Sequence, residues 1–128
     1  ADYNAVLDMP DAPAEQKARA LGNLGWARYV AGDLQGSVAA SEQALALKAD
    51  MDWVQANLGL ALLRLRRTDE GLRHYREAIG AITQPAELDR IVVTDLRDAM
   101  KADPGLPGAE AVLEMVERRK GELAARQS

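Results

Sequence analysis

The sequence predicts an all-α fold of about seven helices that pair as antiparallel hairpins, and two observations support this prediction. First, the Asn-Leu-Gly tripeptide at residues 23–25 returns 34 residues later at residues 57–59, and Ala44 returns at the same offset as Ala78. Second, apolar residues recur every three or four positions on both sides of short turns, which is typical of amphipathic helices. A fixed period of roughly 20 to 50 residues indicates stacked copies of one supersecondary unit, so a solenoid is expected.

The first elements of the chain are the end of one helix and the start of the next. Apolar residues at helical spacing predict the tail of a truncated repeat over residues 1–9. The chain begins without Met and inside this pattern, so we expect it to be a fragment of a longer protein. Pro13 suits a first helical turn, and the next helix is expected over residues 15–31.

A Gly-Asp pair predicts the turn that closes the first hairpin. Gly32 permits a left-handed backbone, and Asp33 can cap the helix that follows, which is expected over residues 34–48. The first complete repeat therefore covers residues 14–49.

The second complete repeat is predicted over residues 52–83, with helices at 52–65 and 69–82. Thr68 is the expected N-cap of its second helix, and two acidic residues follow it at the positive end of the helix dipole.

The remaining residues, 85–126, are predicted to form a divergent pair of helices that caps the array. The first carries an apolar stripe from Leu88 to Met100, and a Pro- and Gly-rich break separates it from a final helix over 109–125. The terminal unit of a solenoid needs a polar outer face, and we assign Arg119 to that face together with its charged neighbours. The whole chain, 1–128, is expected to be one domain.

The repeat resembles the tetratricopeptide repeat (TPR). Its Leu-Gly pair, its small residue and its later alanine stand at Leu24-Gly25, Ser37 and Ala44, and again at Leu58-Gly59, Gly71 and Ala78. Tyr75 fills the aromatic position in the second copy, but Ser41 replaces it in the first, and the proline between repeats is absent. The resemblance implies a right-handed α-solenoid. The linker before Leu21 is similar to those of TPR arrays in bacterial multidomain proteins, and the chain looks like the C-terminal end of such an array.

Composition argues against several classes of function. The net charge of −4 gives no basic excess for nucleic acid, and the longest apolar run is far too short to span a membrane. The chain has no Cys and only one histidine, His74, which argues against a metal site. No convergent acid, base and nucleophile are evident, and no Gly-rich phosphate loop is present. We therefore expect no enzyme activity, no cofactor, no nucleic-acid or membrane partner, and a cytoplasmic location.

The TPR resemblance implies a concave groove lined by the first helix of each hairpin. Trp and Tyr are enriched among binding hot spots, and asparagines at equivalent positions could hydrogen-bond a peptide backbone. In the capping helix, the same helical offsets point to Glu87, Ile91, Thr94 and Asp98. The candidate partner-binding residues are Asn23, Trp26, Tyr29, Val30, Trp53, Asn57, Leu60, Arg64 and Arg90.

Alternatives remain for several of these residues. Trp26 and Trp53 could instead pack between neighbouring repeats, and the asparagines could bridge helices. Some TPR proteins clamp a C-terminal carboxylate with Lys and Asn, but Gly22 and Trp26 occupy those positions here. An apolar or aromatic ligand, with an acidic residue near Arg64 and Arg90, fits better.

The sequence therefore predicts a protein–protein interaction module that binds a peptide or helix of a partner in its groove. It would be a non-catalytic part of a larger protein. The alternative is a structural scaffold that self-associates into homo-oligomers, which concentration-dependent mass would distinguish. An enzyme or a nucleic-acid binder is the third class, and the missing site residues and negative charge argue against it.

Overall fold

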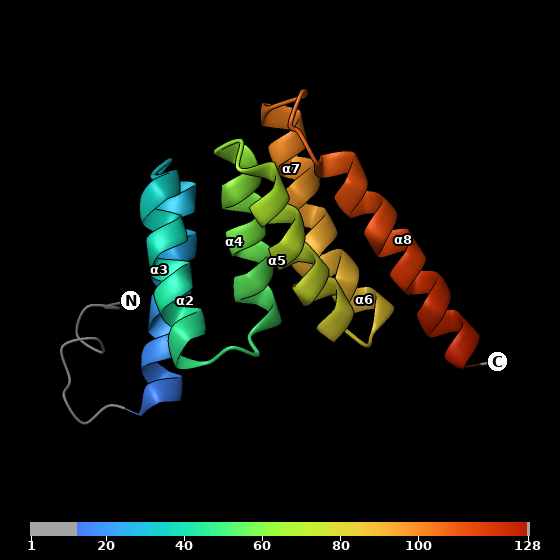
Figure 1. Ribbon diagram of the computed structural model, residues 1–128, viewed down its shortest axis with the longest axis horizontal. Coiled ribbons are helices and arrows are strands. Elements are labelled where there is room, and N and C mark those ends of the chain that lie inside the picture. The colour runs from blue at the N-terminus through green and yellow to red at the C-terminus, as the bar shows by residue number, and fades with distance from the viewer. Residues whose placement is uncertain (1–12, 128) are drawn as a thin grey trace.

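The computed structural model describes residues 13–127, and these residues are helical with no strand (Figure 1). They form six helices, if the continuous helical segment 85–102 is counted once. The all-α prediction is confirmed, and the expected tail over residues 1–9 lies outside the described residues. The helices are α2 (Ala14–Val30), α3 (Leu34–Leu47), α4 (Asp52–Arg64), α5 (Thr68–Ala81), α6 (Pro85–Leu88), the π-helical η1 (Asp89–Val93), α7 (Thr94–Ala102) and α8 (Ala109–Arg126).

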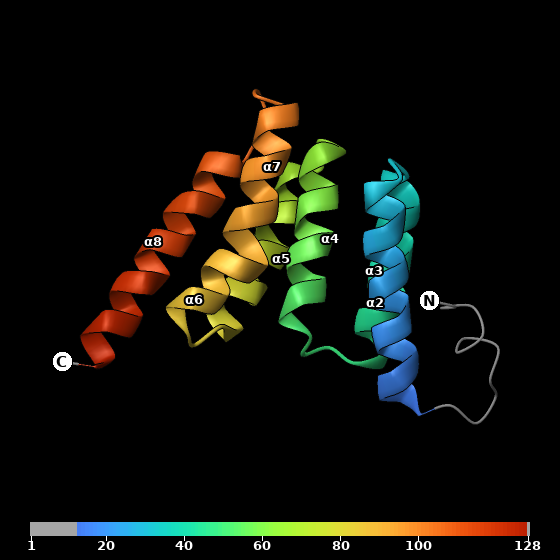
Figure 2. The ribbon, with the colours of Figure 1, turned by 180° about the vertical axis from the view of Figure 1, so that it is seen from behind.

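From α2 to α5, helices that follow one another in sequence pack together in space. α2 packs against α3, α3 against α4, and α4 against α5, while α8 packs against α5. Seen from behind in Figure 2, α2, α4 and the segment α6–η1–α7 lie side by side on one face of the molecule. This face is the one that the sequence predicts as a groove.

The predicted turn between α2 and α3 is confirmed. Gly32 has a φ of +89°, and the Asp33 carboxylate accepts a hydrogen bond of 2.9 Å from the backbone N–H of Gly36. This interaction satisfies one of the backbone donors that the start of a helix leaves without a partner.

The equivalent turn between α4 and α5 is built differently. Arg66 stands 34 residues after Gly32 and also adopts a left-handed backbone, with a φ of +65°. α5 begins at Thr68 itself and has no side-chain cap, so the prediction of Thr68 as N-cap is wrong. The Arg66 guanidinium forms two hydrogen bonds with Asp103, at 2.7 and 3.2 Å, which tie this turn to the end of α7.

The glycine of the repeated Leu-Gly dipeptide lies where two packed helices come close together. A Cβ added at Gly25 would lie 2.6 Å from Ser41 Oγ on α3. A Cβ added at Gly59 would lie 2.7 Å from the Tyr75 ring on α5. The same contact therefore recurs with the 34-residue period, and only glycine leaves room for it.

The largest cluster of buried residues joins α4 and α5 to the C-terminal helices. The predicted apolar stripes of those helices contribute Leu88, Ile91, Val92 and Leu96, and Val112, Val116 and Leu123. Two smaller clusters join α2 and α3 to α4. No helix among the described residues is both long and apolar enough to cross a membrane.

Arg119 is not on the outer face of α8, which corrects the prediction from its sequence pattern. It is 8% exposed, and its guanidinium donates hydrogen bonds of 3.1 Å to the carbonyl of Ile82 and 3.3 Å to that of Gly80. These carbonyls lie at the C-terminal end of α5, where a positive charge is favourable. Arg119 thus attaches α8 to α5.

Candidate functional site

Two adjoining pockets lie on the face formed by α2, α4 and α7. The first has a volume of about 190 Å³ and the second about 270 Å³, and both include Trp26 and Asp95. Because they share these residues, we treat them as one feature, the groove. Asn23, Trp26, Trp53, Asn57, Arg90, Ile91 and Asp95 line the first pocket; Trp26, Tyr29, Val30, Arg64, Asp95, Asp98, Ala99 and Ala102 line the second.

Trp26 lines both pockets. Its ring stacks on Tyr29, with centroids 5.0 Å apart and planes inclined by 14°. The Arg64 guanidinium carbon lies 5.5 Å from the centre of the Tyr29 ring, and Arg64 donates a hydrogen bond of 3.4 Å to the Tyr29 hydroxyl. Trp26 is half-buried and does not pack against any of the clusters of buried residues. Its ring is therefore held by a neighbouring ring rather than by the core.

Trp53 belongs to both the core and the groove. It is half-buried and packs against two of the clusters of buried residues. Its indole lies over Gly22 of α2, because a Cβ added there would be 2.5 Å from Trp53 Cη2. The same side chain lines the first pocket. The two interpretations considered from sequence, core packing and groove lining, therefore both apply.

The two asparagines at equivalent positions line the first pocket together. Asn23 is exposed and Asn57 is half-buried. Neither side-chain amide hydrogen-bonds another residue of the described part of the chain, so the bridge between helices considered as an alternative is not formed. Each amide can offer two N–H donors and a carbonyl acceptor to a ligand.

Leu60 is the one of the nine candidate partner-binding residues that does not line the groove, which corrects the prediction. Of the four residues that the helical offsets gave in the segment 85–102, Ile91 and Asp98 line the groove and Glu87 and Thr94 do not. Leu60 is 1% exposed and belongs to the largest buried cluster. η1 packs against α4, and its residues Ile91 and Val92 lie in the same cluster. Leu60 therefore cannot contact a ligand in the groove.

Asp95 was missed by the sequence-based offsets, which placed Thr94 on the groove instead. Ile91, Asp95, Asp98 and Ala102 line the groove at steps of four, three and four residues, which is ordinary α-helical spacing. The offsets took a step of three residues after Ile91, whereas the structure takes a step of four. The Thr94 hydroxyl donates a hydrogen bond of 3.0 Å to the carbonyl of Asp89.

The charges of the groove differ in how they are partnered. Arg90 forms an ion pair with Glu87, which lowers the Glu87 pKa through that hydrogen bond. Arg64 contacts Tyr29 as described. The carboxylates of Asp95 and Asp98 have no hydrogen-bond or ion-pair partner among the described residues. Burial raises the pKa of Asp95, and the nearby negative charge of Asp98 raises it further.

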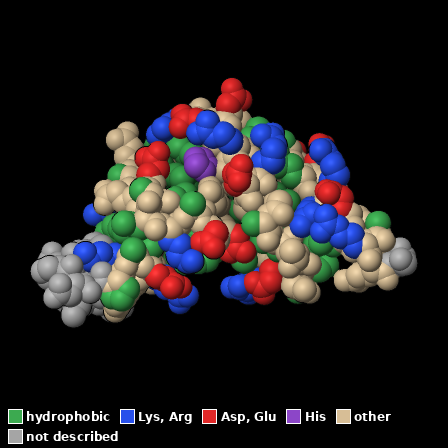
Figure 3. Space-filling view, turned by 60° about the horizontal axis from the view of Figure 1, so that its bottom comes forward, with side chains coloured by type: hydrophobic (Ala, Val, Ile, Leu, Met, Phe, Trp, Pro, Cys, Tyr) green, Lys and Arg blue, Asp and Glu red, His purple; other side chains and the backbone are tan. Residues whose placement is uncertain are grey.

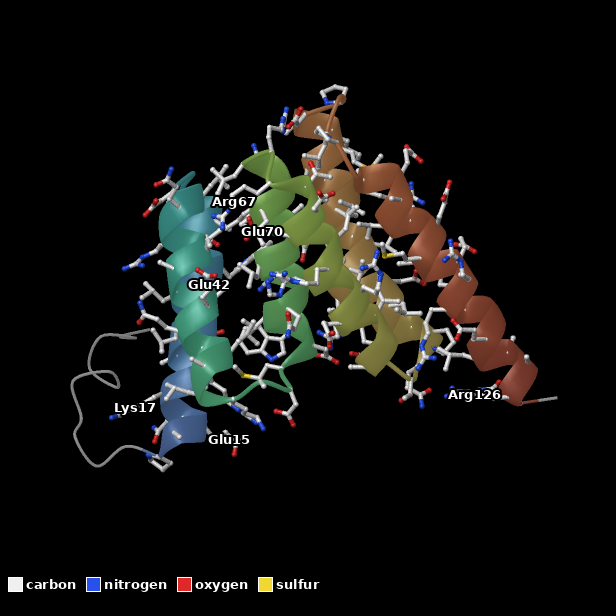
Figure 4. All side chains as sticks on the ribbon, viewed as in Figure 1. Glu15, Lys17, Glu42, Arg67, Glu70 and Arg126 are labelled. Atoms are coloured by element: carbon white, nitrogen blue, oxygen red, sulfur yellow. The ribbon has the colours of Figure 1, made fainter. Side chains whose placement is uncertain are left out.

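A larger hollow, of about 420 Å³, lies on the opposite side, between α3 and the turn before α5. Its Arg67 is already engaged with Glu70 through hydrogen bonds of 3.1 and 2.8 Å, and Glu42 lies close enough to raise the Arg67 pKa further. Figure 4 shows these three side chains between α3 and α5. The hollow contains no aromatic side chain, and we consider it a weaker candidate than the groove despite its size.

The single histidine offers little chemistry. His74 Nδ1 lies 2.6 Å from Gln55 Oε1, and burial lowers the His74 pKa. The face seen in Figure 3 carries the histidine among interspersed basic and acidic side chains. Within residues 13–127, no group of three or more His, Cys, Asp or Glu residues could hold a metal ion.

No protein-family model, curated protein or solved structure matches this chain. Any functional proposal therefore rests on its own residues and geometry.

Proposed function

We propose that this chain is a non-catalytic, TPR-like protein-interaction module that forms part of a larger protein. In this proposal, the groove along α2, α4 and α7 binds a peptide or helix of a partner protein. The main support is the pair of adjoining pockets that share the exposed edge of Trp26 and contain both tryptophans of the chain. Aromatic side chains that are partly exposed to solvent in a concave site are typical binding hot spots.

The proposed architecture is a right-handed solenoid of antiparallel hairpins. Its support is a close contact that recurs at equivalent positions. Gly25 contacts Ser41 and, 34 residues later, Gly59 contacts Tyr75. In such a solenoid each repeat packs against its neighbours, and the first helices share one concave surface.

The form of the groove favours a peptide over a small molecule. It consists of two adjoining pockets of about 190 and 270 Å³ that open to solvent, rather than one enclosed cavity. Two neighbouring shallow pockets suit successive side chains of one segment, which is how helices and extended peptides bind in grooves. The amides of Asn23 and Asn57 could then hydrogen-bond the backbone of that segment.

Affinity capture from a bacterial lysate tests the proposal. The bait is the chain itself, compared with Trp26→Ala, which removes groove surface without removing a core contact. Arg126→Ala is the control, because Arg126 is exposed on α8 and outside the groove. A partner retained by the parent and by Arg126→Ala but lost by Trp26→Ala is expected. Equal capture by all three folded proteins would contradict the proposal.

Self-association is the second candidate, and two exposed apolar side chains favour it. Val30 is 67% exposed and Leu47 is 44% exposed, the two large hydrophobic residues of the described chain that are most open to water. Sedimentation velocity over a wide range of concentration would test this function. A mass that rises with concentration in the parent, but not in a Val30→Ser/Leu47→Ser variant, would support a scaffold that binds copies of itself.

A further inference from the structure

The groove presents two carboxylates that form no ion pair or hydrogen bond within the described residues. Four charged residues line it, namely Arg64, Arg90, Asp95 and Asp98. Arg90 is paired with Glu87, and the Arg64 guanidinium lies against the Tyr29 ring and its hydroxyl. Both cations are therefore already engaged by neighbouring side chains.

The two aspartates, in contrast, have no partner. Their carboxylates make no hydrogen bond and no ion pair within residues 13–127. Asp95 is half-buried and lines both pockets, next to Trp26, and Asp98 lies about one turn further along α7 in the second pocket. A half-buried carboxylate loses part of its hydration, and without a partner no protein group compensates for that loss. A cationic ligand would supply the missing ion pair.

We propose that the partner segment carries a lysine or arginine that pairs with Asp95 and Asp98, flanked by an apolar or aromatic residue that contacts Trp26. This inference rests on the proposed function of the groove and specifies the chemistry of its ligand. It reverses the expectation from sequence, in which an acidic ligand residue lay near Arg64 and Arg90. Arg90 would have to leave Glu87 to bind an acidic residue, and Arg64 is held against Tyr29 with only its remaining N–H groups open, whereas Asp95 and Asp98 have no partner among residues 13–127 and can bind a basic residue.

Neutralising the aspartates should weaken binding strongly. A hydrogen bond between a ligand cation and a partly buried carboxylate is among the stronger polar contacts, so Asp95→Asn is expected to weaken binding about tenfold or more. Asp98 is exposed, and Asp98→Lys is expected to fold normally and to repel the same ligand.

Selection from a displayed library of random linear peptides is the experiment that tests this proposal. The immobilised parent chain, Trp26→Ala and Asp98→Lys are each used as bait, after circular dichroism has shown that all three are folded. Peptides enriched by the parent are then synthesised, and their affinities for the parent, Trp26→Ala, Asp95→Asn and Asp98→Lys, all confirmed to be folded, are measured by fluorescence polarisation.

Each outcome decides between the proposals. We expect the parent to enrich peptides with Lys or Arg beside an apolar residue, and these to lose affinity for Trp26→Ala, Asp95→Asn and Asp98→Lys. Peptides that depend on Trp26 but lack basic residues, or bind Asp98→Lys equally well, would overturn this inference and leave the groove function standing. Absence of any peptide that depends on Trp26 would overturn the groove function itself.

Discussion

Replacing Gly22 with alanine would test the contact on which both the α2–α4 packing and the first pocket depend. A Cβ at this position would lie 2.5 Å from Trp53 Cη2 and 2.8 Å from Val54 Cγ2. Both distances are far shorter than the roughly 3.5 to 4.0 Å that carbon atoms prefer. Gly121 of α8 provides the matched control, because an added Cβ there has no neighbour within 4 Å.

The two substitutions should change stability in opposite directions. Alanine is more favourable than glycine inside a helix by about 1 kcal/mol, so Gly121→Ala is expected to raise the free energy of unfolding by about that amount. Gly22→Ala gains the same propensity but overpacks the interface, which typically costs about 1 to 3 kcal/mol. We therefore expect Gly22→Ala to lower the free energy of unfolding by about 1 kcal/mol, a difference of about 2 kcal/mol between the variants.

Urea unfolding followed by circular dichroism would measure both variants, with tryptophan fluorescence reporting on the environments of Trp26 and Trp53 together. A double-mutant cycle with Trp53→Leu adds a sharper test, because a smaller side chain over residue 22 should reduce the cost of Gly22→Ala. If Gly22→Ala stabilised the protein as much as Gly121→Ala, the packing of Trp53 on α2 described above would be wrong.

Three further predictions concern single residues. Arg66→Gly should be more stable than Arg66→Ala by about 1 kcal/mol in urea unfolding, because both lose the pair with Asp103 but only glycine adopts a φ of +65° without strain. Ser41→Ala should raise the free energy of unfolding by about 1 kcal/mol, measured in the same way, because the Ser41 hydroxyl is buried without a partner. The free energy of unfolding should fall as the pH drops below about 6.5, because burial lowers the folded-state pKa of His74 and the unfolded chain therefore binds the proton more readily. The fall should be smaller in His74→Gln, which lacks this imidazole. Urea midpoints between about pH 8 and pH 5 would check this dependence.

The helices that carry the sequence repeat could be predicted with little error. Their apolar spacing and the Gly32-Asp33 turn are local features, and the structure reproduces them because a tight turn and an N-cap depend on a few neighbouring residues. Thr68 shows the limit of this reasoning. Its residue type suits a cap, but the left-handed backbone of Arg66 closes the turn and α5 already includes Thr68.

Most of the groove was predictable from helical spacing. On α2 and α4, ordinary helical offsets identify Trp26, Trp53 and Asn57 as neighbours of one pocket. On the segment α6–η1–α7, Asp98 lines the groove as the offsets predict, but Asp95 lines it in place of Thr94. Steps of three and of four residues are both compatible with one helix face, so helical spacing alone could not choose between Thr94 and Asp95.

Tertiary contacts account for the other errors. Leu60 lies on the predicted stripe, but η1 packs on α4 there and Leu60 is buried. Arg119 has charged neighbours in sequence, yet its guanidinium binds carbonyls at the end of α5 that are 37 and 39 residues away. The periodicity of one helix cannot reveal which of its faces a distant segment covers.

Trp53 links ligand binding to stability, and Trp26 provides the contrast. Trp53 packs on Gly22 and also lines the first pocket, so moving its ring should weaken the fold and the groove together. Trp26 is held by Tyr29 outside the buried clusters, so its removal should weaken binding more than it weakens folding. A peptide at about a hundredfold excess over its dissociation constant should stabilise the parent by about 2.7 kcal/mol, because it binds only the folded chain. If Trp26→Ala abolished that stabilisation while retaining most of the unligated stability, Trp26 would be a residue that contacts the ligand without supporting the fold.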